Sequence, residues 1–286
     1  MFGFLGFFLP SFNYLPTLGK GELSLNYFYI SMNIPGISKS ILLSIFTGLV
    51  STALALFFSQ VILLYFFKNK FYNYLKIIIS PLIALPHITM AIGLIFLLSP
   101  SGLLLRSVSP WLTGFDRPPN SYLFPDEYGF FLILGLILKE IPFLILVSLS
   151  ALREFSSSIF FDIGKSLQHS SFSTWFILIF PIIYKKIRLV IFIIIAFSSS
   201  VVDMSLLLAP STPSTLSVRI LQIFQSSDMD SFFIASNLSL IQLFIIIILL
   251  IVWIFFEKII KLKLFYIFFI KITSFKSEFL KITILC

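Results

Sequence analysis

Long apolar stretches alternate with short polar ones along the chain, and this pattern predicts a helical membrane protein. Each of five stretches contains roughly the 20 apolar residues that an α-helix needs to cross a hydrocarbon layer about 30 Å thick. We expect these full spans at residues 40–67, 77–98, 129–150, 187–208 and 233–256. Residues 1–9 are apolar but too short to cross, and they predict the last part of a further, partial N-terminal helix.

The same pattern divides the chain into three parts. Residues 1–39 hold the partial first helix and a loop interrupted by prolines and glycines. Residues 40–256 form the predicted transmembrane domain, which contains a long polar segment at 151–186. Residues 257–286 predict either a basic tail or the beginning of an interrupted second half of a longer protein, and the pattern fits both.

Composition supports the same fold class. Of the 286 residues, 58% are hydrophobic and 11% are charged, and the mean hydropathy is +1.07. A soluble core could not bury this much apolar surface. We therefore predict an all-α, polytopic membrane protein with about five full spans and one partial span.

The basic residues predict the orientation of these spans. Lysine and arginine gather after the span 40–67, in the segment 151–186 and beyond residue 257, whereas the loops 99–128 and 209–232 hold few of them. Because loops rich in lysine and arginine stay on the cytoplasmic side, we expect the polar segment and the tail to be cytoplasmic. The net charge of +8 then reflects orientation against membrane lipid and does not indicate nucleic-acid binding.

The segment 151–186 is the most informative part of the chain, because a membrane protein rarely keeps so long a polar stretch between spans without a partner in the water. Apolar side chains recur within it at helical spacing, at Ile159, Phe160, Ile163 and Leu167. A short helix there would present one apolar stripe. The alternatives are docking to a protein partner and an interfacial helix that rests its phenylalanines among lipid headgroups.

This segment resembles the EAA loop of ATP-binding-cassette importer permeases, whose pattern is E-A-A, then a glycine, then Leu-Pro. Asp162-Ile163-Gly164 stands in the place of E-A-A, Gln168 in that of the glycine, and Phe180-Pro181 in that of Leu-Pro. The resemblance implies a helix that docks on an ATP-binding subunit and passes its closure to the membrane helices. The docking residues that it implies are Phe160, Asp162, Ile163, Gly164, Leu167, Gln168 and Pro181.

Gln168 departs from the family pattern. If the turn requires a left-handed backbone, glycine adopts it at little cost, whereas glutamine costs roughly 1 to 2 kcal/mol. The conformation of residues 168–170 is therefore open at the level of the sequence.

Three further stretches, at residues 85–102, 124–152 and 201–222, resemble the thiamine-type permease group and above all its fused, two-halved members. The resemblance implies the N-terminal half of an importer that works by alternating access. It also implies three kinds of partner, namely an ATP-binding subunit, a second permease half and a periplasmic solute-binding protein. Thiamine is suggested as the solute by this resemblance alone.

A few ionisable residues lie at or near membrane depth, where they are costly and often line a pathway: His87, Lys139, Glu140 and Asp203. Pro86 and Pro142 free helix carbonyls close to these charges. One hypothesis is a translocation path through His87, in which Glu140 and Asp203 contact a cationic solute. The other is structural, with Lys139 paired to a neighbouring acid and Asp203 capping a helix end.

The sequence offers no catalytic constellation and predicts no cofactor and no metal site. Gly164-Lys165-Ser166 looks like the end of a P-loop, but Ile159 occupies the place of its first glycine, so ATP hydrolysis is expected on a separate chain. Cys286 is the single cysteine. Other interpretations are an ion-coupled secondary transporter that uses Glu140 or Asp203, a lipid-modifying enzyme, and a truncated, inactive permease.

Overall fold

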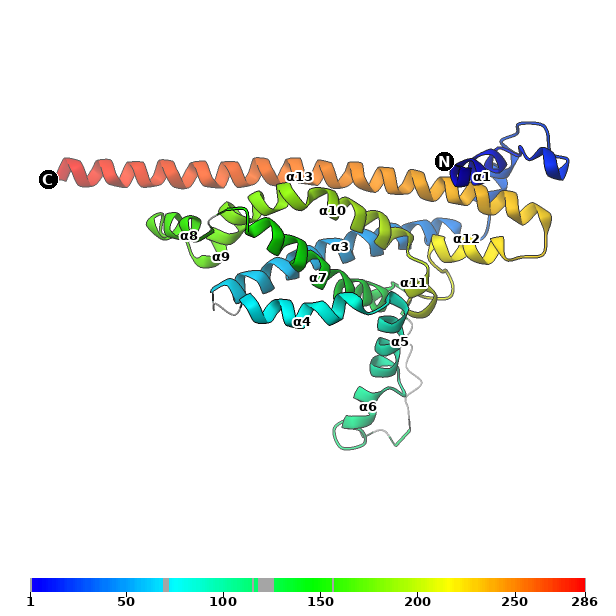
Figure 1. The fold of residues 1–286 in the computed structure, drawn as a ribbon, viewed down its shortest axis with the longest axis horizontal. Helices are drawn as coiled ribbons and strands as arrows, with labels where there is room; N and C mark the ends of the chain where they lie inside the picture. Colours follow the sequence, from blue (N-terminus) through cyan, green and yellow to red (C-terminus); the bar gives the residue numbers. More distant parts are fainter. Residues whose placement is uncertain (1, 69–71, 115, 118–125, 156, 286) are drawn as a thin grey trace.

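The protein is all-α and crosses the membrane more than once. The computed structural model describes residues 2–68, 72–114, 116–117, 126–155 and 157–285, and these ranges contain helices and no strand. The larger helices form a bundle whose long axis is horizontal in Figure 1. The helices are α1 (Phe2–Ser11), α2 (Asn26–Met32), α3 (Ile37–Lys68), α4 (Tyr72–Ala84), α5 (His87–Leu98), α6 (Leu103–Val108), α7 (Phe130–Leu152), α8 (Ser157–Ser166), α9 (Ser171–Thr174), α10 (Phe180–Ser200), α11 (Asp203–Leu208), α12 (Leu216–Phe224) and α13 (Met229–Leu285), with a 3₁₀ turn η1 (Pro16–Leu18) and a π-helical turn η2 (Trp175–Ile179).

Four helical stretches in the described ranges are long and apolar enough to cross a membrane: Ile37–Phe67, His87–Val108, Phe130–Leu152 and Met229–Ile260. The sequence pattern predicts five full spans, and two of these differ in the structure. The span expected at 77–98 is divided between α4 and α5. The one expected at 187–208 is divided between α10 and α11.

Both divisions have a local cause. Pro86 has no N–H and disfavours a helical conformation for the residue before it, so α4 ends at Ala84 and α5 begins at His87. At the end of α10, the hydroxyls of Ser199 and Ser200 donate to the carbonyl of Ala196, at 3.1 and 2.7 Å. Such bonds of serine hydroxyls to a preceding carbonyl compete locally with helical structure, and Val201 follows in an extended conformation, with φ −61° and ψ 135°.

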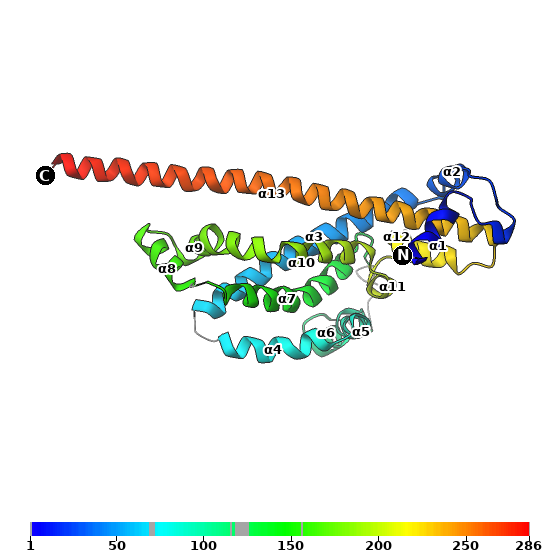
Figure 2. The same cartoon turned by 45° about the horizontal axis from the view of Figure 1, so that its top comes forward.

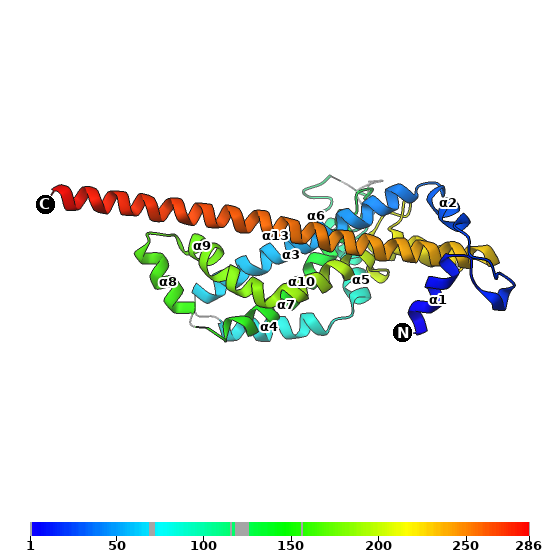
Figure 3. The same ribbon diagram turned by 90° about the horizontal axis from the view of Figure 1, so that it is seen from above.

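The core lies between α3, α7, α10 and α13, which run along one another in all three ribbon views (Figures 1, 2 and 3). On α10 the side chains of Ile183, Ile187 and Ile191 recur every fourth residue and are fully buried. That spacing puts them on one face of the helix. They form a single apolar core together with α3, α7 and α13.

At Gly48, α3 packs closely against α10. A Cβ added to Gly48 would lie 2.8 Å from the Cβ of Ser199 and 2.9 Å from its Cα. The hydroxyl of Thr52 turns back to the carbonyl of Gly48, 2.8 Å away, so this polar group needs no partner on α10. The small residues of α3 therefore allow the two backbones to approach, as they do in many membrane helix pairs.

A second, smaller core joins α5, α11 and α7. Its buried residues are Ala91, Leu94, Leu132, Leu136, Val201, Met204, Leu208 and Ala209. A Cβ on Gly135 of α7 would lie 2.6 Å from Leu208 Cδ1 and 2.7 Å from Met204 Cε. The short helix α11 thus sits directly on α7 at this glycine.

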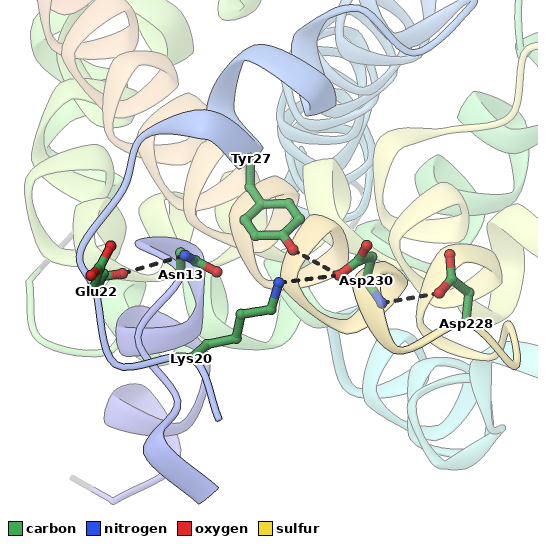
Figure 4. Close-up of polar contacts among 6 residues, drawn as sticks. All are labelled: Asn13, Lys20, Glu22, Tyr27, Asp228 and Asp230. Carbon is green, nitrogen blue, oxygen red and sulfur yellow. Dashed lines mark hydrogen bonds and ion pairs between the residues drawn. The ribbon is translucent and has the colours of Figure 1, made fainter. Parts of the chain in front are cut away.

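The N-terminal loop is tied to the beginning of α13 by polar contacts (Figure 4). The hydroxyl of Tyr27 donates to Asp230 Oδ1 at 2.8 Å, and Lys20 Nζ lies 3.8 Å from the same oxygen. Burial and this hydrogen bond raise the pKa of Tyr27 to about 12, so the phenol remains a donor at neutral pH. The tyrosine ring also stacks on Phe233, with ring centroids 5.2 Å apart.

Candidate functional site

The polar segment folds into the short helix α8, a tight turn and the helix α9, at one end of the bundle (Figure 2). The turn is a Schellman motif. The N–H of His169 donates to the carbonyl of Gly164 at 2.8 Å, and the N–H of Gln168 donates to that of Lys165 at 2.9 Å. Gln168 has a φ of +55°, so the residue in the place of the family's glycine does adopt the left-handed conformation.

Replacing Gln168 by glycine is therefore expected to stabilise the protein. The gain from relieving the left-handed backbone is roughly 1 to 2 kcal/mol, offset in part by the greater freedom of glycine in the unfolded chain. We expect a net increase of up to about 1 kcal/mol in the free energy of unfolding, measured by denaturant titration in detergent. Gln225→Gly is the matched control, because Gln225 caps α12 in the right-handed conformation and its replacement should destabilise.

Gly164 allows α8 and α9 to lie against each other. A Cβ at this position would meet the side chain of Thr174, whose Cβ would be only 2.9 Å away. Thr174 is itself buried, and its hydroxyl donates to the carbonyl of Ser170 at 3.0 Å. The small residue that the EAA pattern has here is thus required by packing inside the segment.

The inner face of α8 is aromatic and holds the helix to the bundle. Phe161 stacks on Phe67 of α3, with ring centroids 5.5 Å apart, and also contacts the fully buried Trp175. Phe160 packs edge-on against Phe155 at 5.7 Å. Of the predicted docking residues, Phe160 therefore lies half-buried on the anchoring side.

The outer face of α8 carries exposed apolar side chains between charged ones. Ile159 is 57% exposed and Ile163, one turn later, is 44% exposed, with Asp162 and Lys165 exposed beside them. The exposed residues among the predicted docking residues are Asp162, Ile163, Gln168 and Pro181. The half-buried ones are Phe160 and Leu167, and the buried one is Gly164.

The segment continues into α10 without a break. From α9 the chain enters the π turn η2, in which the N–H of Phe180 donates to the carbonyl of Trp175, five residues earlier. Pro181 follows in the first turn of α10 and has no N–H to donate to the carbonyl four residues before it. The wider turn lies directly before this proline, and the helical path runs on to Ser200.

Polar contacts fasten the beginning of α10 to α13 and to the end of α7. Arg188 forms a two-point ion pair with Glu257 of α13, in which Nη2 lies 2.9 Å from Oε2 and Nε lies 3.2 Å from Oε1. Tyr184 donates to the same carboxylate and accepts from the indole of Trp253 at 2.8 Å. Lys186 forms an ion pair with Glu154. These contacts join α10 to α13 and to the chain just after α7.

The ionisable residues predicted at membrane depth lie where α4 gives way to α5. Lys139 of α7 donates to the carbonyls at the end of α4: Ile83 at 3.0 Å, Leu82 at 3.4 Å and also Leu85. These are carbonyls that the break at Pro86 leaves without helical donors. The sequence-based alternative paired Lys139 with an acid, whereas the structure gives it carbonyls, which attract a cation at a helix C-terminus.

Glu140 and His87 line a cavity of about 350 Å³ beside this lysine. The remaining lining residues are Ile83, Leu85, Lys139, Phe143, Ile193, Ile194 and Phe197. The ring of His87 packs on that of Phe197, with centroids 4.8 Å apart. Asp203 lies outside this lining, exposed in the first turn of α11, although within electrostatic reach of His87.

The network around Glu257 has no counterpart among the residues singled out from the sequence. Two signals point to it in hindsight: Tyr184 and Arg188 are four residues apart on one helix face, and Glu257 is an acid among the lysines that follow the last span. Neither signal identifies the partner, because 69 residues separate Arg188 from Glu257.

Comparison with known proteins relates the chain to a bacterial membrane protein. The chain is similar to the inner membrane ABC transporter permease protein YnjC of Escherichia coli (strain K12), with 26% identity over 217 residues. The aligned region covers 75% of this chain and 40% of that protein, so the chain spans about two fifths of the length of its curated relative. No family model matches the chain. The similarity supports a relation to ABC transporter permeases in general.

Proposed function

We propose that the chain is a permease part of an ATP-binding-cassette importer in the bacterial inner membrane, with α8 as the helix that docks on an ATP-binding subunit. The observation that carries the proposal is the form of α8: its aromatic face is anchored to the bundle, and Ile159 and Ile163 remain exposed on the opposite face. A helix that only rested among lipid headgroups would need the exposed apolar residues but no aromatic anchor to the bundle. Because α9, η2 and α10 form one continuous helical path, docking at α8 would move α10 as well.

The remaining partners follow from this role. ATP would be hydrolysed on a separate subunit, and a second permease half would complete the pathway. A periplasmic solute-binding protein would deliver the solute at the α12 end of the bundle, with α8 and the C-terminal tail in the cytoplasm, as the distribution of lysine and arginine predicts. Thiamine or a related small solute is the substrate that the family resemblance favours. The similarity to YnjC is in keeping with a permease role.

Ile163→Asp tests the docking surface. The ATP-binding subunit would be identified by its P-loop in the DNA that flanks the gene, co-expressed with the chain, and its dissociation constant measured in nanodiscs. Because the variant places a carboxylate without a partner in an apolar contact, which is strongly unfavourable, we expect association to weaken about tenfold or more. Leu112→Asp is the matched control, since Leu112 is also exposed but lies in the loop after α6.

Unchanged association of the Ile163→Asp variant would refute docking through α8. A failure of any P-loop subunit to bind the wild-type protein would refute the importer role as a whole.

A further inference from the structure

The cavity beside α7 is lined by the carboxylate of Glu140. Glu140 is only 5% exposed, yet it makes no hydrogen bond or ion pair with any residue that the structure describes. A buried carboxylate without a partner is strongly destabilising. Lys139 and Glu140 are the charged residues of α7, and because Lys139 is hydrogen-bonded to α4, we infer that the partner of Glu140 comes from outside the chain.

Lys139 acts on this carboxylate through space only, with no hydrogen bond or ion pair between the two side chains. Its ammonium group is directed to the end of α4, where three carbonyls accept its hydrogen bonds. These carbonyls form the negative end of a helix dipole and offset part of its charge. Neighbours on a helix point about 100° apart, so Lys139 reaches the carbonyls of α4 and Glu140 does not, although both side chains line the cavity.

The rest of the lining favours an organic cation over a metal ion. Phe143 lies one turn beyond Glu140, and Phe197 contributes an aromatic ring from α10. Aromatic faces attract cations that carry little water. Calcium needs six to eight oxygen ligands and magnesium a regular octahedron of them. The described residues contain no cluster of three or more acidic, histidine or cysteine side chains that could hold a metal.

We propose that Glu140, with Phe143 and Phe197, forms a binding site for a small, singly charged organic cation within the membrane domain. The proposal rests on the permease function put forward above and gives the solute a chemical class. The carboxylate neutralises the charge of the cation, and the aromatic rings receive its apolar surface. Asp203, which the sequence grouped with Glu140, is not one of the groups that hold this cation.

Two probes of the same shape test the site. Choline carries a quaternary nitrogen where 3,3-dimethylbutan-1-ol has a neutral carbon, so the pair isolates the effect of charge. Binding of each to the wild-type protein in nanodiscs would be measured by saturation-transfer NMR. We expect choline to bind more tightly than the alcohol, and Glu140→Gln to weaken choline binding about tenfold or more while leaving the alcohol unaffected.

Glu127→Gln is the matched control, because it removes an exposed acid outside the cavity. Phe143→Leu provides a second variant should Glu140→Gln fold poorly, and it should weaken choline more than the alcohol. Equal binding of the two probes to the wild-type protein, or full choline affinity in Glu140→Gln, would overturn the proposal.

Docking of the ATP-binding subunit, measured on the same preparations, separates the two proposals. Normal docking without preference for choline refutes the cation site alone. Choline preference without docking refutes the importer role and leaves the cation site in place.

Discussion

Replacing Gly48 by leucine is expected to prevent α3 and α10 from packing. The nearest atoms to a new Cβ are the Cβ and the backbone Cα of Ser199, which cannot turn aside as the end of a long side chain could. Overpacking in a well-packed core typically costs 1 to 3 kcal/mol. Because a whole helix must move here, we expect a loss of about 3 kcal/mol in the free energy of unfolding, measured by denaturant titration in detergent.

Gly93→Leu is the matched control for this substitution. Gly93 lies in α5, is exposed, and a Cβ added there meets nothing within 4 Å. Leucine is the better helix former by up to about 1 kcal/mol, so this variant should be as stable as the wild type or slightly more so. If the two leucine variants unfold at the same denaturant concentration, the close approach of α3 and α10 is wrong.

Arg188→Met is expected to have the second largest effect. It removes the guanidinium that contacts both oxygens of Glu257, a side chain only 7% exposed, and leaves Tyr184 as a donor to that carboxylate. Breaking a fully buried ion pair costs 3 to 5 kcal/mol, but Arg188 is about half exposed, so water replaces part of the interaction. We expect a loss of about 2 kcal/mol in the same titration.

Lys185→Met removes a neighbouring, exposed cation of α10 and should change stability by less than about 0.5 kcal/mol. Adding Glu257→Gln to Arg188→Met removes the stranded charge and should restore part of the loss. A double variant less stable than Arg188→Met alone would show that the carboxylate, and not its pairing, stabilises the contact between α10 and α13.

The fold class could be predicted because hydropathy and length suffice for it. The bounds of two spans could not, since an apolar window averages over the breaks at Pro86 and at residues 201–202. The sequence did indicate that Pro86 frees carbonyls near membrane-depth charges, and Lys139 is the group that binds them. Which side chain reaches those carbonyls depends on how α7 lies against α4, and no local pattern contains that information.

Prediction of the candidate sites was uneven for the same reason. The sequence named a left-handed backbone at Gln168 as a condition of the family pattern and left its conformation open, and the structure has the left-handed form. The sequence also predicted a stripe that includes Phe160 and Ile163. The structure places Phe160 half-buried on the anchoring side and leaves Ile163 exposed, because the orientation of α8 is set by Phe67 and Trp175 from elsewhere in the chain.

The breaks at residues 85–86 and 201–202 have a joint consequence for access to the cavity. Between them they detach α5 and α11 from the long helices, and these two short helices share the smaller core on α7 (Figure 1). Residues 85–86 and 201–202 are therefore places where the chain can change direction without loss of hydrogen bonds inside a helix. His87 is the first residue of α5 and Phe197 belongs to α10, so a change of direction at Pro86 would separate the two rings in the lining of the cavity.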